Sequence, residues 1–467
     1  MRQKPAAAPQ SRSPIVLAVG GELKNTFALV RENTAFMSAH IGDMGSFASQ
    51  EAFAAAINQM LQIHRETPAV VVYDKHPNYA TAGWARRYCA KLRAAGKPVR
   101  EIALQHHRAH ALSLAAEAQI PHMIVACLDG TGFGDDGKIW GGEVIAVQGV
   151  ETERIWHIPE FPLIGGDQAV KQPWRCGLGI CREYGIDYAG TPLAQMETTP
   201  AGKLVISQLN SQIGTVRTTS LGRVFDAVAA LVGITEANYE AQAAVAFQQL
   251  AVSYWQSQGC PDFADLVSAH SGFGGEDCGA RAGAANLVGE FGGCGEFAES
   301  SLVSGDTAQE DFRKLIAKTA QMAREADLAA SAADFENAPA DGKTDSAEKI
   351  AAAGKIAFSF HFELAKIFAG VLIAKSCQRG RIPVGISGGA ALNQLFVQIL
   401  SEMVKAAGLQ FITHSIVPPN DGGLALGQAY YGLFFDGTLD ETFDGTSNGD
   451  SSGNSENFSG EQICSGK

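Results

Sequence analysis

The first apolar stretch of the chain reads Ile15-Val16-Leu17-Ala18-Val19 and runs directly into Gly20-Gly21. A short, continuous apolar run that ends in a glycine pair is typical of a buried strand followed by a tight turn. Other short apolar runs lie at 69–73, 123–128, 143–147, 384–386 and 410–412. We expect each of these runs to form a strand.

Stretches with helical character separate these strands along the chain. They lie at 50–65, 109–118, 222–232, 358–374, 392–407 and 424–431. Short apolar strands that alternate with helices predict an α/β fold, in which ligands bind where strands end.

The composition indicates a globular protein and restricts its partners. The 467 residues are 46% hydrophobic and 18% charged, and this length allows about two or three domains. No uninterrupted apolar run reaches the roughly 18 residues of a membrane span, so we expect a cytoplasmic protein with no membrane partner. The nine cysteines form no Cys-x-x-Cys pair, which disfavours a disulfide framework or a zinc finger.

The net charge of −13 is concentrated in two segments. Residues 258–349 carry 17 acidic and 7 basic side chains, and residues 436–467 carry 7 and 1. The other residues together have a net charge of +3, and the three basic side chains of residues 1–13 account for it. Because the rest of the chain is close to neutral, we expect no nucleic-acid partner.

The strongest chemical signal is the pair His106 and His110 in the stretch Gln105-His106-His107-Arg108-Ala109-His110. Side chains four residues apart share a helix face, so both imidazoles can bind one metal ion. The same spacing also occurs on solvated helices. The metal interpretation therefore needs further ligands.

Two aspartates can supply these ligands. Asp129 ends the expected strand 123–128 and opens the glycine-rich loop 129–137, and Asp421 lies in Pro418-Pro419-Asn420-Asp421-Gly422-Gly423 before a helical stretch. Either carboxylate can instead close an Asx turn. Two imidazoles and two carboxylates would suit iron or zinc, and the ligands alone do not decide between them.

Three loops contain glycines that free backbone N–H groups to approach a phosphate. They lie at 20–26, 129–137 and 387–393. None matches a Walker or Rossmann fingerprint, and each alone is also compatible with a simple turn.

As a set, these residues resemble the C-terminal carbamoyltransferase part of the HypF hydrogenase-maturation proteins, which are related to TsaD tRNA-modification enzymes and antibiotic O-carbamoyltransferases. The resemblance covers residues 14–257 and 350–435. Its motifs follow in order at 21–26, 40–43, 74–77, 105–110, 129–134, 140–143, 165–167, 173–175, 222–226, 239–240, 387–389, 393 and 418–423.

The resemblance implies an actin-like ATPase (ASKHA) fold, with two α/β lobes around a nucleotide cleft. It implies a single iron or zinc ion bound by His106, His110, Asp129 and Asp421. It places His76 and Lys24 near the phosphate or carbamoyl end as catalytic residues. It assigns the nucleoside contacts to Asp226, Gly388, Gly389 and Asn393.

The implied activity is transfer of a carbamoyl group from ATP-derived carbamoyl-adenylate to an acceptor, which for HypF is the C-terminal cysteine of its partner HypE. The acylphosphatase-like, zinc-module and adenylate-forming parts of HypF proteins have no counterpart in this sequence. We therefore expect a separate protein to supply the adenylate. The alternatives are a catalytically reduced nucleotide- or partner-binding paralogue and a small-molecule O-carbamoyltransferase.

The sequence predicts five segments. Residues 1–13 form a disordered arm, 14–257 form the N-terminal lobe and the start of the second lobe, and 350–435 complete the second lobe. Residues 258–349 form an acidic insertion or subdomain with one amphipathic helix at 307–333, and 436–467 form a disordered acidic tail. The family pattern Tyr-Glu-Gly-Gln is replaced here by Tyr239-Glu240-Ala241-Gln242, which is expected to weaken nucleoside contacts.

Overall fold

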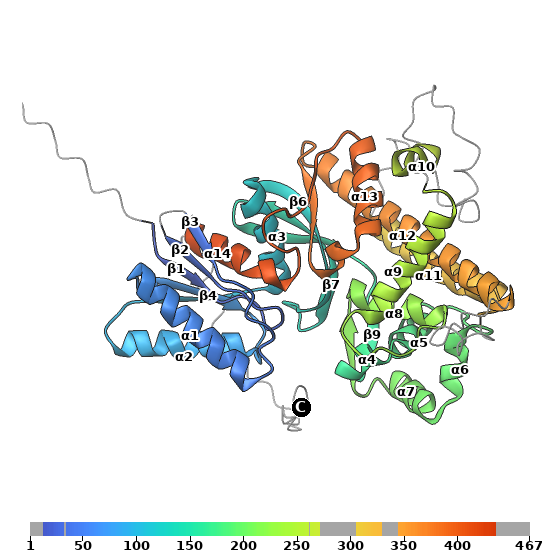
Figure 1. Cartoon of the computed structure of the whole chain (residues 1–467), viewed down its shortest axis with the longest axis horizontal. Coiled ribbons are helices and arrows are strands. Elements are labelled where there is room, and N and C mark those ends of the chain that lie inside the picture. Colours follow the sequence, from blue (N-terminus) through green and yellow to red (C-terminus); the bar gives the residue numbers. More distant parts are fainter. Residues whose placement is uncertain (1–12, 32–33, 261, 271–304, 329–343, 436–467) are drawn as a thin grey trace, which may run out of the picture.

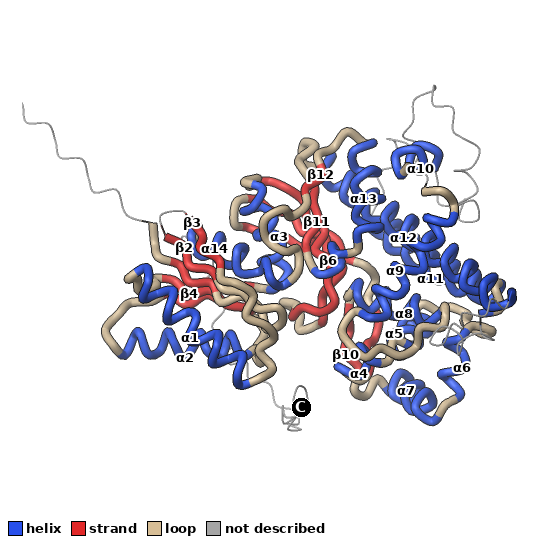
Figure 2. The backbone as a smooth tube through the Cα atoms, viewed as in Figure 1, coloured by secondary structure: helices blue, strands red, loops and turns tan. Residues whose placement is uncertain are grey.

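The protein, as a computed structural model, is built around two β-sheets, each covered by helices (Figures 1 and 2). The structure describes residues 13–31, 34–260, 262–270, 305–328 and 344–435. The predicted α/β architecture with two lobes is confirmed. The expected tail 436–467, and the expected arm apart from Ser13, lie outside the described residues.

The first sheet has the strand order β3-β2-β1-β4-β5. Its strands are β1 (Val16–Ala18), β2 (Ala28–Arg31), β3 (Thr34–Met37), β4 (Val70–Asp74) and β5 (Arg100–Leu104). β1 pairs antiparallel with β2 and parallel with β4. Helices α1 (Phe47–His64) and α2 (Ala80–Ala94) pack on one face, and α14 (Leu424–Phe434) packs on the other. Because both faces are covered, β1 is a continuous apolar run.

The second sheet has the order β12-β11-β6-β7-β10-β9, and β8 pairs with β7. Its strands are β6 (His122–Phe133), β7 (Ile139–Gln148), β8 (Glu151–His157), β9 (Phe161–Ile164), β10 (Thr215–Thr218), β11 (Val384–Ser387) and β12 (Phe411–Ile412). The helices of this lobe are α4 (Asp167–Lys171), α5 (Trp174–Glu183), α6 (Pro192–Thr198), α7 (Pro200–Ser211), α8 (Leu221–Leu231), α9 (Gln242–Ser257), α10 (Phe263–His270), α11 (Gly305–Glu325), α12 (Thr344–Cys377) and α13 (Gln394–Ala406).

A layer of two helices lies between the sheets. Helix α3 (His106–Ala118) packs against β6, β7 and β11, whereas α14 packs against β1, β2 and β4, and the two helices pack on each other. They approach closely at Gly427, where a Cβ atom would collide with the carbonyl oxygen of Ala109. His106 and His110 at the start of α3 are therefore buried, which positions the candidate site.

Each predicted strand and helix coincides with an observed element, although β6 and β7 extend beyond their predicted ends. The amphipathic helix expected at 307–333 is α11, which ends at Glu325; residues 329–333 are outside the described part. Phe312, Leu315 and Ile316 of α11 are buried in the core that also contains α12. This part of the acidic segment thus packs on the second lobe.

Helix α12 contains the longest apolar helical stretch among the described residues. The stretch Ala347–Cys377 is long and apolar enough to cross a membrane, but 89% of its most apolar window is buried inside the protein. It is therefore the core helix of the second lobe, and its apolar character is explained by packing.

Candidate metal centre

Helix α3 carries the two predicted imidazole ligands at its first turns. The side chain of Gln105 accepts a hydrogen bond from the backbone N–H of Arg108 (2.9 Å) and so caps the helix. His106 and His110 are 0% and 1% exposed. Because α3 lies between the two sheets, these polar rings are held in the interior rather than on a solvated face.

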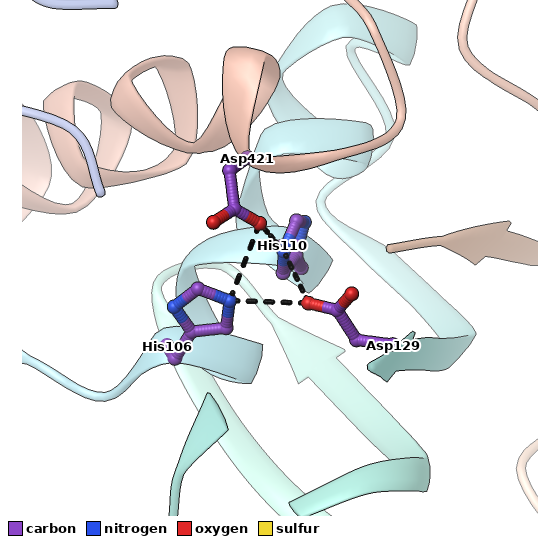
Figure 3. A group of neighbouring side chains, drawn as sticks. All are labelled: His106, His110, Asp129 and Asp421. Carbon is purple, nitrogen blue, oxygen red and sulfur yellow. Dashed lines mark hydrogen bonds and ion pairs between the residues drawn. The ribbon is translucent and has the colours of Figure 1, made fainter. Parts of the chain in front are cut away.

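The two aspartates reach the same place from other elements. Asp129 lies on β6, where the pairing with β7 changes register between Leu128 and Gly132. Asp421 begins a short 3-10 turn, η3 (Asp421–Gly423), that leads into α14. Figure 3 shows both carboxylates pointing toward the two imidazoles.

The distances between these groups match those around a single ion. His106 Nε2 lies 3.2 Å from Asp129 Oδ2 and 3.6 Å from Asp421 Oδ1, and His110 Nε2 lies 3.4 and 3.5 Å from the same two oxygens. All four ligand atoms lie within 4.8 Å of one another. Ligands about 2.1 Å from a tetrahedral zinc ion are about 3.4 Å apart. The donor set therefore fits a cation.

Neighbouring groups orient two of the four ligands. Asp74 Oδ2 lies 2.7 Å from His106 Nδ1 and accepts a hydrogen bond from it, which leaves Nε2 as the ring nitrogen that faces the other ligands. Asp129 Oδ1 accepts hydrogen bonds from the backbone N–H groups of Gly130 (2.8 Å) and Gly389 (3.2 Å). The other oxygen of Asp129 therefore points toward the imidazoles.

The electrostatics of the cluster also favour a cation. His110 Nε2 is buried and has no hydrogen bond of good geometry among the described residues. Burial lowers the pKa of His106, but the carboxylates of Asp421 and Asp74 outweigh this effect and hold its pKa well above the usual range. The site thus attracts positive charge, which a divalent ion would supply in place of the Nε2 protons of the imidazoles.

A pocket of about 220 Å³ adjoins the cluster. Asp129 and Asp421 form one end, and Lys24 and Glu240 meet across it in an ion pair of 3.0 Å. Its remaining lining residues are Leu23, Gly130, Thr131, Gly222, Arg223, Phe225, Ala241, Ala244, Val245, Gln248, Gly389, Ala390, Leu392, Asn393 and Asn420. The pocket therefore joins the ligands to a mainly apolar wall from α8, α9 and the turn η2 (Gly389–Leu392).

Three of the predicted catalytic and nucleoside-binding residues line this pocket, namely Lys24, Gly389 and Asn393. Lys24 has a left-handed backbone conformation (φ 47°). The side chain of Asn393 caps α13 by accepting from Phe396 N–H (3.1 Å), and its Nδ2 lies 2.9 Å from His361 Nε2. Asn393 therefore has a structural role in addition to its place in the wall.

The other predicted residues lie beside the pocket rather than in its lining. Asp226 is 2% exposed, and its Oδ2 lies 2.8 Å from Arg223 Nε. Burial raises the pKa of Asp226 to about 6. Gly388 has a φ of 97° and packs against the backbone of Leu128.

His76 also lies outside the pocket lining. Its ring stacks on Tyr79 with a centroid distance of 4.1 Å, and its Nδ1 accepts a hydrogen bond from Asn78 N–H. Its backbone N–H donates to Asp74 Oδ1 (2.8 Å). His76 is therefore linked to the metal cluster through Asp74.

Sequence reasoning missed Asp74, Arg223 and Glu240 as parts of the site. Asp74 ends β4, which pairs in parallel with β5, and β5 leads into α3. The rule that ligands gather at the ends of parallel strands would have selected it. Glu240 stands in a recognised motif, but its contact with Lys24 joins residues 216 positions apart.

Two family models match the chain. The one described as "HypF Kae1-like domain" matches residues 11–117. The one described as "Carbamoyltransferase, Kae1-like Domain, second subdomain" matches residues 125–265 and 317–428, which is more than half of the chain. The gap between the last two ranges falls in the acidic segment.

Curated relatives extend the likeness over most of the sequence. "Carbamoyltransferase HypF2" of Cupriavidus necator is 33% identical over 433 residues, covering 92% of this chain and 48% of that protein. "Carbamoyltransferase HypF homolog" of the same organism is 29% identical over 438 residues, covering 92% and 94%. The chain therefore spans about half the length of the first relative and nearly all of the second.

Two solved structures have a similar fold. The crystal structure of T.kodakarensis HypF aligns with a TM-score of 0.66 and 26% identity over 91% of this chain and 49% of that one. The structure of full-length HypF in the phosphate- and nucleotide-bound form gives a TM-score of 0.65 and 25% identity, over 90% and 46%.

Proposed function

The chain belongs to the HypF family through its Kae1-like carbamoyltransferase domain, and we propose that it is a metal-dependent carbamoyltransferase. The group moves from carbamoyl-adenylate to an acceptor, a cysteine of a HypE-like partner protein in the maturation of nickel–iron hydrogenase. A separate protein supplies the adenylate, and the reaction takes place in the cytoplasm. The observation that carries this proposal is the convergence of two imidazoles and two carboxylates at one end of a pocket.

The reaction takes place at the metal end of the pocket. His106, His110, Asp129 and Asp421 would hold the ion, and this mixed nitrogen and oxygen set would suit iron or zinc. When bound, the ion supplies Lewis-acid polarisation of a carbonyl or phosphoryl oxygen. Asp74 holds His106 in the tautomer that presents Nε2 to the ion, through its hydrogen bond at Nδ1.

Lys24 supports binding of the phosphate at the same end. Burial lowers its pKa, but Glu240 and the nearby carboxylates raise it more, so the ammonium group stays charged. A charged ammonium group in the pocket lining favours an anionic phosphate. His76, which is linked to the cluster through Asp74, acts near the carbamoyl or phosphate end.

The apolar wall of the pocket supports binding of the nucleoside. Phe225, Val245 and Leu392 present aromatic or aliphatic surface, which suits a flat base. Gly389 and Asn393 contact the nucleoside from this wall. Asp226 and Gly388 lie next to the lining residues and support the nucleoside site from there.

The acceptor thiolate attacks the carbamoyl carbon. The new C–S bond forms as the C–O bond to the phosphate breaks, and AMP leaves with the electron pair. The side chains of this chain orient the adenylate between the metal end and the apolar wall, so that its carbamoyl carbon is held in place for the attack.

The experiment supplies chemically prepared carbamoyl-adenylate to the metal-loaded chain, together with an acceptor protein that ends in a cysteine. We expect the acceptor to gain the mass of one carbamoyl group on that cysteine, measured by mass spectrometry. A His106→Ala/His110→Ala variant should give no adduct above the rate without protein.

A matched control is His122→Ala, because His122 is exposed and lies outside the cluster. Nucleotide binding without any transfer would replace the proposal with the reduced binding paralogue. Transfer to a small-molecule hydroxyl, but not to the thiol, would identify an O-carbamoyltransferase.

A further inference from the structure

A carboxylate at the far end of α3 holds the segment that delivers Asp421. Glu117 lies about two helical turns beyond His110, and its side chain is 5% exposed. Its Oε1 accepts hydrogen bonds from the backbone N–H of Ser415 (2.5 Å) and Ile416 (2.8 Å) and from Ser415 Oγ (2.9 Å). Its Oε2 accepts from Val417 N–H (3.2 Å).

These bonds fix the path of the chain into the metal cluster. The segment 415–417 continues through Pro418-Pro419-Asn420 directly into Asp421. The carbonyl oxygen of Pro419 also accepts a hydrogen bond from Gly388 N–H (2.8 Å). The helix that carries both imidazoles therefore also anchors the segment that brings the opposing carboxylate.

A second branch leads from Glu117 to His110. His414 Nδ1 lies 2.8 Å from Glu117 Oε2, and His414 Nε2 lies 3.0 Å from Ser387 Oγ. Ser387 Oγ lies 3.5 Å from His110 Nδ1. The His414 and Ser387 side chains are buried.

The Ser387 hydroxyl has two acceptors in reach, His414 Nε2 at 3.0 Å and the carbonyl oxygen of Pro419 at 3.4 Å, and the shorter contact gives the following arrangement of protons. If His110 binds a cation through Nε2, its Nδ1 carries the proton and donates to Ser387 Oγ. Ser387 then donates to His414 Nε2, and His414 donates from Nδ1 to the Glu117 carboxylate. Each donor has an acceptor, and the negative charge at the end of the branch supports the neutral imidazole tautomer of His110.

We propose that Glu117 is a positioning residue of the metal centre, acting on Asp421 through the segment 415–417 and on His110 through His414 and Ser387. This inference rests on the metal site of the proposed function, because it assigns support to the two ligands that Asp74 and the backbone N–H groups of Gly130 and Gly389 do not contact. Glu117 itself does not touch the cation or the substrate.

The charge and shape of Glu117 are both needed for this role. Three backbone N–H groups, one hydroxyl group and one imidazole N–H converge on its two oxygens. A glutamine in its place would offer one oxygen and would direct N–H groups toward other donors. The segment and the imidazole branch cannot then both be satisfied.

The test compares zinc affinity of the full chain and a Glu117→Gln variant by competition with a chromophoric chelator. We expect affinity to fall roughly 10–100-fold, the range seen when an outer-shell partner of a ligand is lost. The visible absorption bands of the cobalt-substituted protein should also change, since they report the ligand geometry. A folded Glu117→Gln variant with unchanged affinity and spectrum would overturn the inference.

The matched control is Glu402→Gln, because Glu402 is a helical glutamate whose carboxylate pairs with Lys405 away from the cluster. Its zinc affinity should equal that of the unmodified chain. A second variant, His414→Phe, leaves the backbone contacts of Glu117 in place and breaks the branch to His110, because phenylalanine has neither donor nor acceptor. If Glu117→Gln does not fold, unchanged zinc affinity in His414→Phe would itself contradict the inference.

A measurement without metal separates this inference from the proposed function. If the unmodified chain binds no zinc, iron or cobalt, the proposed function fails. Amide hydrogen exchange of the peptide 414–421 in the metal-free protein then decides the role of Glu117. Faster exchange of this peptide in Glu117→Gln would support the proposal that Glu117 holds the segment 415–417. Unchanged exchange would overturn that proposal.

Discussion

The two ends of the pocket are built by different physical means. At the metal end, Asp129 is 8% exposed and its oxygen Oδ1 is fixed by two backbone N–H groups. At the end formed by α9 and the turn η2, Val245 and Leu392 are 41% and 51% exposed. Polar networks fix the position of buried groups, whereas an exposed apolar wall tolerates changes of sequence and shape.

The backbone at the start of α9 illustrates this tolerance. Ala241 adopts a left-handed conformation (φ 64°) immediately before α9, a conformation that favours glycine. A residue with a Cβ atom is strained there by roughly 1–2 kcal/mol. The comparison shows that hydrogen bonds fix the carboxylate at one end of the pocket, whereas the exposed apolar side chains of the wall are not held in this way.

The largest effect is expected from removing both imidazole ligands at the metal end of the pocket. The double variant His106→Ala/His110→Ala should lose the bound ion, from about one per chain to none, because only two carboxylates remain of a four-ligand site. Elemental analysis of the purified proteins measures the ion content. His122→Ala should retain the ion, and equal metal content in all three proteins would refute the ligand assignment.

A smaller effect is expected from changing Asp74, which contacts only one of the four ligands, His106. Asp74→Asn keeps the shape of the side chain but removes the charge that faces His106 Nδ1. Zinc affinity should fall roughly 10–100-fold, as for other carboxylate partners of metal-bound histidine. Titration against a chelator measures it. An affinity equal to that of the unmodified chain would mean that the tautomer of His106 is set by other groups.

The free energy of unfolding should also depend on pH through Glu117. Burial raises its pKa, but hydrogen bonds from Ser415, His414 and Ile416 lower it to about 2, from an ordinary value of 4.5. A carboxyl group whose pKa is lower in the folded state stabilises the fold above its unfolded pKa and loses that contribution as pH falls. The difference in unfolding free energy between the unmodified chain and Glu117→Gln should therefore shrink from pH 4.5 toward 2.

Urea unfolding of the metal-free proteins at a series of pH values measures this difference. Glu402→Gln again serves as the control and should show a pH dependence like that of the unmodified chain. A constant difference between the unmodified chain and Glu117→Gln across this pH range would mean that the Glu117 charge does not stabilise the fold.

The smallest expected effect is a change in stability at Ala241, beside the apolar wall of the pocket. Ala241→Gly removes strain of roughly 1–2 kcal/mol and costs roughly 0.4–1 kcal/mol in added freedom of the unfolded chain. The net result should be stabilisation by about 0.5–1 kcal/mol. Chemical denaturation measures it. Ala246→Gly, in the second turn of α9, should have the opposite sign, and a destabilised Ala241→Gly would show that the left-handed conformation carries no strain.

The sequence alone predicted the elements and part of the site for different reasons. Strands such as β1 and β4 follow from continuous apolar runs, because both faces of the sheet are covered. The pair His106 and His110 follows from helical spacing. Asp129 and Asp421 were identifiable as candidates beside glycine turns, but local pattern alone could not bring them together with the imidazoles.

Support by distant groups was not predictable from local pattern. Glu117 contacts Ser415, which is 298 positions away, and Lys24 contacts Glu240 across 216 positions. Neither contact leaves a periodic or compositional signal, because each depends on how α3, α9 and the segment before α14 are placed by the fold. Such contacts appear only once the tertiary structure is known.

The most direct test of the central claim is a crystal structure of the zinc-loaded chain with anomalous diffraction measured at the zinc edge. We predict one strong peak bonded to Nε2 of His106 and His110 and to carboxylate oxygens of Asp129 and Asp421, at about 2.0–2.2 Å. A peak at other residues, or a zinc ion bound without Asp421, would contradict it.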